Sequence, residues 1–147
     1  MVRIIIPFII FIIFVAVTIV CGCIQQSSLS KIQMEEDYIL VYVKVGPIDL
    51  RCFNKSYLVN EADYILDCTV DKVDLKADMY SGIYSYVYLT VNNYIKGNQL
   101  PSNKLKIIVT VRTPIKFNQG EKVRLYLKNV EGKLVLFCQD RGVEKLS

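Results

Sequence analysis

The stretch IYSYVYLTVNNYI, residues 83–95, carries the longest run of alternating side chains in the chain. Its aliphatic residues recur at every second position: Val87, Leu89 and Val91. A period of two places these side chains on one face of a β-strand and leaves the other face to polar and aromatic groups. Residues 83–95 therefore predict a long strand with one buried face, and a β-sheet as the framework of the fold.

The same period recurs on both sides of this stretch. Further strands are predicted over 38–45, 63–73, 104–112, 122–128 and 133–139. Gly46-Pro47 ends the first of them, because proline cannot donate a ladder hydrogen bond. Residues 56–62 differ, since Ser56 stands at an N-cap-like position and predicts one or two helical turns. The chain thus predicts about six strands and one short helix.

The links between the later strands are short and contain turn residues such as Gly and Asn. Short links join antiparallel neighbours, whereas parallel neighbours need longer crossovers. Along each strand the apolar side chains share one face, while basic residues such as Lys106 and Arg124 occupy the other. One buried and one solvated face per strand is what a small closed barrel or sandwich requires. The predicted fold class is all-β and antiparallel.

Three segments together resemble a known family: VNEADYILDCTVDKV, VYLTVNNYIKG and FNQGEKVRLYLK. The matching features are Ala62-Asp63 before one strand, Lys96-Gly97 at the close of another, and Phe117 with Gly120-Glu121 leading into a third. They resemble the OB-fold-like extracytoplasmic modules of prokaryotic secreted proteins, which are also similar to netrin-like domains. The resemblance implies an OB-like barrel of five to six strands. Such barrels carry many functions, so the resemblance names no ligand.

The chain begins with an apolar segment that differs in composition from the rest. Residues 4–20 hold no charged side chain, and Arg3 precedes them. A positive flank followed by an apolar run is typical of a secretory signal peptide or of a first transmembrane helix. As a helix, this run would span about 26 Å, a little less than the hydrocarbon core of a bilayer. Its length therefore leaves both interpretations open.

Directly after this segment stands Val20-Cys21-Gly22-Cys23. It resembles the lipobox of prokaryotic lipoproteins, bacterial or archaeal, in which the last cysteine carries a lipid and becomes the mature N-terminus. The resemblance implies that Cys23 is the lipid attachment site and that residues 1–23 include a signal peptide. The alternative is an uncleaved transmembrane helix in which both thiols are small apolar groups. Either interpretation predicts a protein anchored to the cell membrane, with its C-terminal domain outside the cytoplasm.

Two further segments follow the predicted anchor. Residues 24–37 are polar and rich in Gln and Ser, without a sustained helical or strand period, and predict a tether. Residues 38–147 contain the predicted strands and form the expected extracytoplasmic barrel domain.

The predicted barrel domain contains three cysteines: Cys52, Cys68 and Cys138. Disulfides form outside the cytoplasm, and an odd number of cysteines leaves one unpaired. Cys68 and Cys138 both fall on the inward faces of their predicted strands. They are interpreted either as a disulfide across the barrel or as two small buried side chains.

Catalytic and metal sites have little support in the sequence. The chain has no histidine, which argues against triads with an imidazole base, zinc sites and c-type haem attachment. Aspartates do recur, but Asp67 and Asp71 on one strand would lie about 13 Å apart, too far for an acid–base pair. We interpret these aspartates as solvated charges, and we predict no catalytic residue, metal or cofactor.

Tyrosines occupy the outer face of the 83–95 strand: Tyr84, Tyr86 and Tyr88. Tyrosine offers an apolar ring with a polar tip, and the outer surface of the middle strands of OB-folds often binds ligands. The three residues are therefore a candidate binding face. The alternative is that they reflect only the preference of tyrosine for strands.

The expected partners follow from location and charge. Without Arg3 the net charge of +4 becomes +3, a mild excess that favours an anionic surface, either lipid headgroups or a wall polymer. The candidate partners are an envelope protein or an anionic surface polymer. Nucleic acid is not expected outside the cytoplasm. Asn54-Lys55-Ser56 matches a glycosylation sequon, with Asn54 as the acceptor. The expected function is a non-catalytic, membrane-anchored binding or envelope module. The alternative is an enzyme or enzyme inhibitor of unidentified class.

Overall fold

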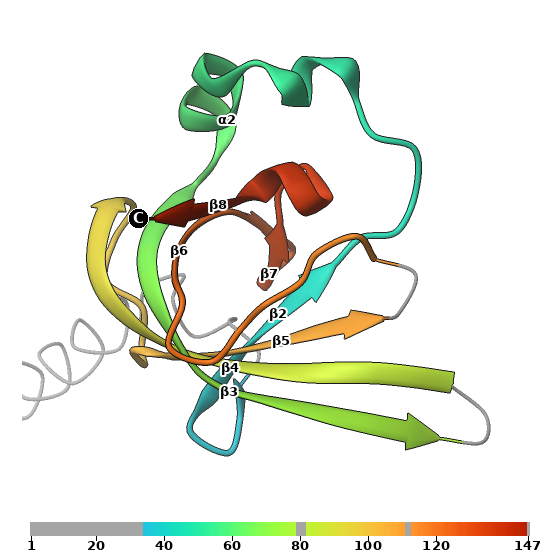
Figure 1. Ribbon diagram of the computed structural model, residues 1–147. Coiled ribbons are helices and arrows are strands. Elements are labelled where there is room, and N and C mark those ends of the chain that lie inside the picture. The colour runs from blue at the N-terminus through green and yellow to red at the C-terminus, as the bar shows by residue number, and fades with distance from the viewer. Residues whose placement is uncertain (1–33, 79–81, 111–112, 147) are drawn as a thin grey trace, which may run out of the picture. The chain divides into compact units, whose positions relative to one another are not determined.

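The computed structural model describes residues 34–78, 82–110 and 113–146 (Figure 1). In chain order the elements are β1 (Met34–Glu35), β2 (Tyr38–Val43), η2 (Leu50–Phe53), α2 (Lys55–Glu61), β3 (Tyr64–Asp78), β4 (Gly82–Lys96), β5 (Lys104–Thr110), β6 (Lys122–Val130), β7 (Lys133–Leu136), η3 (Gln139–Gly142) and β8 (Val143–Leu146). The predicted apolar helix, Cys23 and most of the predicted tether lie outside the described residues. Within those three ranges, no helix is long and apolar enough to cross a membrane.

Six strands close into a barrel in the order β2, β5, β4, β3, β6 and β7, because β7 pairs in turn with β2. The short strands β1 and β8 add to its sides, through β2 and β6 respectively. Figure 1 looks along the interior of this barrel, with α2 lying above the ring of strands. A largely β-structure with one short α-helix is thus confirmed, and the barrel is compatible with an OB-like fold.

The sheet is mixed, so the prediction of a purely antiparallel barrel is wrong. The strand β2 runs parallel to both β5 and β7, with Val41 opposite Ile107 on one side and Leu134 on the other. The short links of the later strands do join antiparallel neighbours, as in β3–β4, β4–β5 and β6–β7. They give no information about β2, because its partners lie far along the chain and no short link connects them.

The inward faces fill the barrel with aliphatic side chains, as the alternation predicts. The fully buried members from the six barrel strands are Ile39, Val41, Leu66, Cys68, Val70, Val87, Leu89, Leu105, Ile107, Val123, Leu125, Leu127, Leu134 and Leu136. Three loop residues, Leu100, Ile115 and Phe117, complete the same cluster. Burial of this apolar surface is the main stabilising contribution to the fold.

β-Bulges in the β3–β4 ladder change which residues face the interior of the barrel. The register shifts between Val70 and Lys72 on β3, and it shifts again where Asn92 is skipped on β4. An extra residue in one strand reverses the alternation of the side chains beyond it. Val73 therefore packs against the core although Val70 does so too, and Tyr94 packs inward as well. The outward row of tyrosines ends before Tyr94 for this reason.

Two turns depend on positive φ angles. Gly97 follows β4 with φ of +95°, and a Cβ there would lie 2.8 Å from the Asp63 carbonyl oxygen. Glu131 and Gly132 join β6 to β7 with φ of 53° and 82°. A two-residue hairpin loop with both φ values positive matches the twist of the flanking strands. These turns fix the registers on which the outer faces depend.

A smaller apolar cluster lies beneath α2 and consists of Leu58, Ala62, Ile65 and Tyr126. The helix begins after Asn54, whose side-chain oxygen accepts a hydrogen bond of 2.9 Å from the Ser56 backbone nitrogen. The helix over residues 56–62 is thus confirmed with a shift of one residue, and its cap is Asn54 instead of Ser56.

The predicted Cys68–Cys138 disulfide is wrong, because Cys138 is bonded to Cys52 of η2, with 5.7 Å between their Cα atoms. The strand β7 ends at Leu136, and Cys138 and Gln139 both have positive φ, so the chain leaves the sheet before Cys138. Cys68 is a free thiol that is fully buried in the core. Its burial raises the thiol pKa to about 12, which keeps it protonated and unreactive.

Candidate binding face

The three tyrosines of the predicted binding face stand together on the outer side of β4. The ring centroids of Tyr84 and Tyr86 are 5.2 Å apart, and those of Tyr86 and Tyr88 are 6.5 Å apart. Both pairs are edge-to-face, a favourable arrangement of aromatic quadrupoles. All three side chains are half-buried. Their grouping is seen in the structure, and their binding role stays a prediction.

A fourth tyrosine extends this row onto another strand. Tyr38 opens β2, and its ring lies 5.1 Å from that of Tyr88 at an angle of 72°. The contact arises because β2 lies beside β5, which in turn lies beside β4. Sequence reasoning missed Tyr38, since nothing in the pattern of β2 shows which strand it pairs with.

Lys106 of β5 lies among these rings. Its ammonium nitrogen is 4.2 Å from the ring centroid of Tyr86, 5.8 Å from that of Tyr88, and 3.1 Å from Glu35 Oε1. The side chain is only 10% exposed. This burial by itself lowers the pKa of Lys106, but the hydrogen bond and charge of Glu35 outweigh it, so the pKa is raised. Lys106 therefore remains charged between the rings.

Two other lysines, both exposed, lie beside these rings. Lys72 of β3 lies 5.9 Å from the ring of Tyr88 and 2.8 Å from Asp74 Oδ2. Lys104 of β5 lies 5.6 Å from the ring of Tyr38. We refer to the following residues as the tyrosine–lysine face: Tyr38, Tyr84, Tyr86, Tyr88, Lys72, Lys104 and Lys106.

The chemistry of the tyrosine–lysine face combines aromatic contact with positive charge. Two of its three lysines are paired with carboxylates, Lys72 with Asp74 and Lys106 with Glu35. Ammonium groups over aromatic rings are held by cation–π attraction, and they can still attract an anion on their exposed side. The rings supply apolar area at low entropic cost. Such a surface can bind an anionic partner.

The aspartates of β3 have structural partners in the described chain. Asp67 makes two hydrogen bonds with Arg124, at 2.7 and 2.9 Å, which raise the pKa of the arginine. Asp71 accepts a hydrogen bond from Thr90 at 2.7 Å, and Asp63 accepts one from a backbone nitrogen of β6 at 2.8 Å. Among the residues with described side chains, no group of acidic, histidine or cysteine residues could hold a metal. Asp67 is thus largely covered and paired, unlike the solvated charge that the sequence predicts, whereas Asp71 is exposed.

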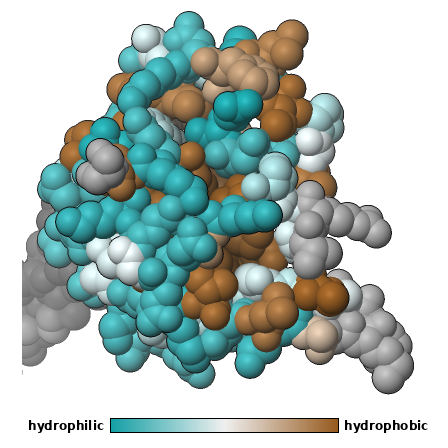
Figure 2. All heavy atoms as spheres, viewed as in Figure 1, coloured by the Kyte–Doolittle hydropathy of each residue, from teal (hydrophilic) through white to brown (hydrophobic). Residues whose placement is uncertain are grey.

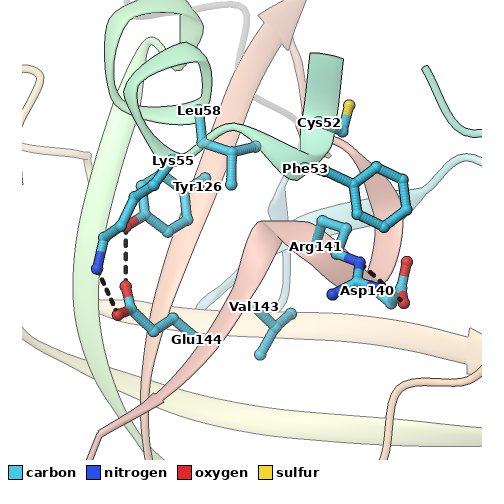
Figure 3. A pocket seen from close by; sticks show the side chains of 9 residues that line it. All are labelled: Cys52, Phe53, Lys55, Leu58, Tyr126, Asp140, Arg141, Val143 and Glu144. Carbon is cyan, nitrogen blue, oxygen red and sulfur yellow. Dashed lines mark hydrogen bonds and ion pairs between the residues drawn. The ribbon is translucent and has the colours of Figure 1, made fainter. Parts of the chain in front are cut away.

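A shallow pocket of about 280 Å³ lies where η2, α2 and β8 meet (Figure 3). On one side Lys55 and Tyr126 converge on the Glu144 carboxylate, at 2.7 and 2.9 Å. The hydrogen bond from Lys55 lowers the pKa of Glu144, while burial raises the pKa of the Tyr126 phenol. Glu144 is therefore ionised and engaged on both oxygens at neutral pH, which makes it a poor general acid or base.

The other side of the pocket contains Phe53, Asp140 and Arg141 (Figure 3). The Arg141 guanidinium lies 4.5 Å from the Phe53 ring and 4.0 Å from Asp140 Oδ2. Cys52 also lines the pocket, but its sulfur belongs to the disulfide and is not a free nucleophile. The buried Oδ1 atom of Asp140 has no hydrogen-bond partner among the described residues.

Two predicted sites remain to be placed. Asn54 is exposed at the start of α2, where its side-chain oxygen caps the helix, and its glycosylation stays a prediction. Cys23 lies outside the described residues.

Comparisons with known proteins assign no family to the chain. No protein-family model matches it, and no curated protein matches it in sequence. A functional assignment therefore rests on the tyrosine–lysine face, the disulfide and the N-terminal sequence.

Proposed function

We propose that the chain is a non-catalytic, membrane-anchored extracytoplasmic module whose tyrosine–lysine face binds an anionic surface of the cell envelope. The observation that carries this proposal is the face itself, a continuous row of four rings interleaved with ammonium groups. Aromatic side chains are enriched where proteins bind partners, and complementary charge selects the partner and speeds its encounter.

The N-terminal sequence and the disulfide support the proposed location. Arg3, the apolar residues 4–20 and the lipobox-like Val20-Cys21-Gly22-Cys23 occur in the order that export and lipid attachment require. The Cys52–Cys138 bond adds an independent argument, because disulfides persist in oxidising compartments outside the cytoplasm.

The anchor is tested by metabolic labelling in a prokaryotic host with a radiolabelled lipid precursor. The wild-type chain and Cys21→Ser should both take up label, whereas Cys23→Ser should not. The Cys21 variant is the matched control, because it removes a thiol two positions away. Absence of label from the wild type, together with an intact Met1 in the mass spectrum, would replace the lipid anchor by a transmembrane helix.

The binding face is tested with the full chain in mild detergent on beads that carry a polyphosphate polymer. Replacing Tyr86 and Tyr88 together by Ser should lower retention by about tenfold or more, as loss of aromatic anchor residues commonly costs over 1 kcal/mol each. Tyr57→Ser is the matched control, because Tyr57 is also half-buried and lies outside the face, against Phe137. Both variants should keep the melting temperature of a folded barrel.

Three outcomes would count against the proposal. Equal retention of the double variant and Tyr57→Ser would show that the face does not bind polyanions. Retention on beads with uncharged polymer would show that charge is irrelevant. Binding to isolated envelopes that disappears after protease treatment of those envelopes would point to an envelope protein instead of an anionic surface.

A further inference from the structure

The tyrosine–lysine face adjoins the point at which the described domain begins. The first strand, β1, pairs with the start of β2, so that Glu35 lies opposite Tyr38. The Glu35 carboxylate also contacts Lys106 at the centre of the face. The chain that leads back to the proposed anchor therefore leaves the domain at the edge of this face.

We propose that the anionic surface bound by the tyrosine–lysine face is the headgroup layer of the membrane in which the chain is anchored. This inference rests on the proposed function and names the partner of the same site. The domain would then lie with this face against the bilayer, and it would not project into the envelope to capture a soluble polymer.

The length of the connecting segment favours the bilayer as the partner. Residues 24–33 separate Cys23 from the first described strand. Ten residues reach at most about 35 Å when fully extended, and less in any other conformation. A short connection holds a binding surface at a high effective concentration near the attachment point, provided that the geometry permits contact. The connection begins at the edge of the face, which favours such contact.

The composition of the face also suits a headgroup layer. Tyrosine is enriched at membrane interfaces, where its ring contacts the boundary of the acyl chains and its hydroxyl stays in water. Lysine beside a membrane is attracted to anionic lipids, and its aliphatic stem can lie along apolar groups. Lys72 keeps 61% of its side chain exposed and can reach a headgroup phosphate. Lys106 lies 4.2 Å from the Tyr86 ring.

Another apolar surface is less suited to the membrane. Leu50 and Phe53 on η2 are 83% and 60% exposed. Figure 2 shows hydrophobic surface at the top of the view, where Figure 1 places η2 and α2, whereas the β1–β2 hairpin lies at the bottom of Figure 1. A short connection that leaves from β1 brings the tyrosine–lysine face to the bilayer more readily than the η2 turn. This surface provides the control position.

The absence of tryptophan from the chain allows a direct test. The full chain is reconstituted into phosphatidylcholine vesicles, with or without phosphatidylglycerol, as two single-tryptophan variants, Tyr88→Trp and Phe53→Trp. With phosphatidylglycerol present, tryptophan at position 88 should be quenched by bromine-labelled lipid at least twofold more than tryptophan at position 53. Removing the anionic lipid, or replacing Lys72 and Lys104 by Gln, should reduce that quenching.

The opposite pattern would overturn the inference. Quenching at position 53 but not at 88 would show that the η2 turn meets the membrane, and water-like emission at both positions would show that neither does. If polyphosphate beads still retain the chain in that case, the proposed function stands and its partner is a soluble polyanion. If the beads fail as well, both proposals are wrong.

Discussion

Breaking the Cys52–Cys138 disulfide should remove a large part of the stability of the domain. The bond joins positions separated by 86 residues, so it closes most of the described chain into one loop. Loop-closure entropy for that length gives about 4.6 kcal/mol at 25 °C, and loss of native disulfides from small secreted domains typically costs about 2–5 kcal/mol. A small domain has a total stability of about 5–15 kcal/mol, so the variant should unfold far more easily.

The measurement is guanidinium unfolding of residues 26–147 under oxidising conditions. Cys52→Ser, Cys138→Ser and the double variant should lose the same free energy of unfolding, because each removes the same bond. Adding a reductant to the wild type should bring it to the level of the variants.

The matched control is Cys68→Ala, which removes the third thiol of the domain. It should cost only about 1–2 kcal/mol, from a small cavity in the core, and reduction should destabilise this variant as much as it destabilises the wild type. The reasoning would be refuted if Cys68→Ala abolished the effect of reductant, or if Cys52→Ser left the oxidised stability unchanged. Either result would mean that a bond between Cys52 and Cys138 does not stabilise the domain.

Three further predictions concern the barrel and the pocket. Leu125→Asp should lower the free energy of unfolding by about 4 kcal/mol, because Leu125 is fully buried. Lys122→Asp on the exposed side of β6 should change it by no more than about 0.5 kcal/mol. Similar melting temperatures of the two variants would contradict the strand assignment. Gly97→Ala should lower the free energy of unfolding, measured in urea, by about 1–2 kcal/mol, since φ is +95° and a Cβ would lie 2.8 Å from a backbone oxygen. The pKa of Glu144 is lowered in the folded protein, so its contribution to the free energy of unfolding is complete above its ordinary pKa of about 4.3 and is lost as the pH falls through the folded value. Glu144→Gln should therefore weaken the loss of stability in acid. An unchanged loss would exclude this carboxylate as a cause of it.

The strands could be predicted because a half-buried strand leaves a local signal. Val87 and Leu89 alternate with outward tyrosines, and the same spacing in β5 and β6 locates their buried faces correctly. The strand β3 shows the limit of that signal. Its predicted end is residue 73, but it continues to Asp78, where Leu75 is 71% exposed, so that the last residues of the strand carry no signal of a buried face.

What could not be predicted depends on contacts between distant parts of the chain. The parallel insertion of β2 and the arrival of Tyr38 beside Tyr88 are properties of strand pairing, and no local pattern encodes them. The disulfide was mispredicted for a related reason. Positive φ angles at Cys138 and Gln139 take the chain out of the sheet. Neither residue is a glycine, so the sequence does not indicate a turn there.

The parallel strand β2 has a consequence for how the chain is made. It is the first barrel strand to be synthesised, but its two partners within the barrel, β5 and β7, come much later, and β7 is nearly the last. During synthesis β2 can therefore pair only with the short β1, and the ring of strands cannot be completed until the residues of β7 have emerged. Unpaired strands are prone to aggregation, and non-local pairing slows folding. A chain stalled short of residue 136 would retain hairpins from its middle but would leave one edge of β2 open to any other strand edge nearby.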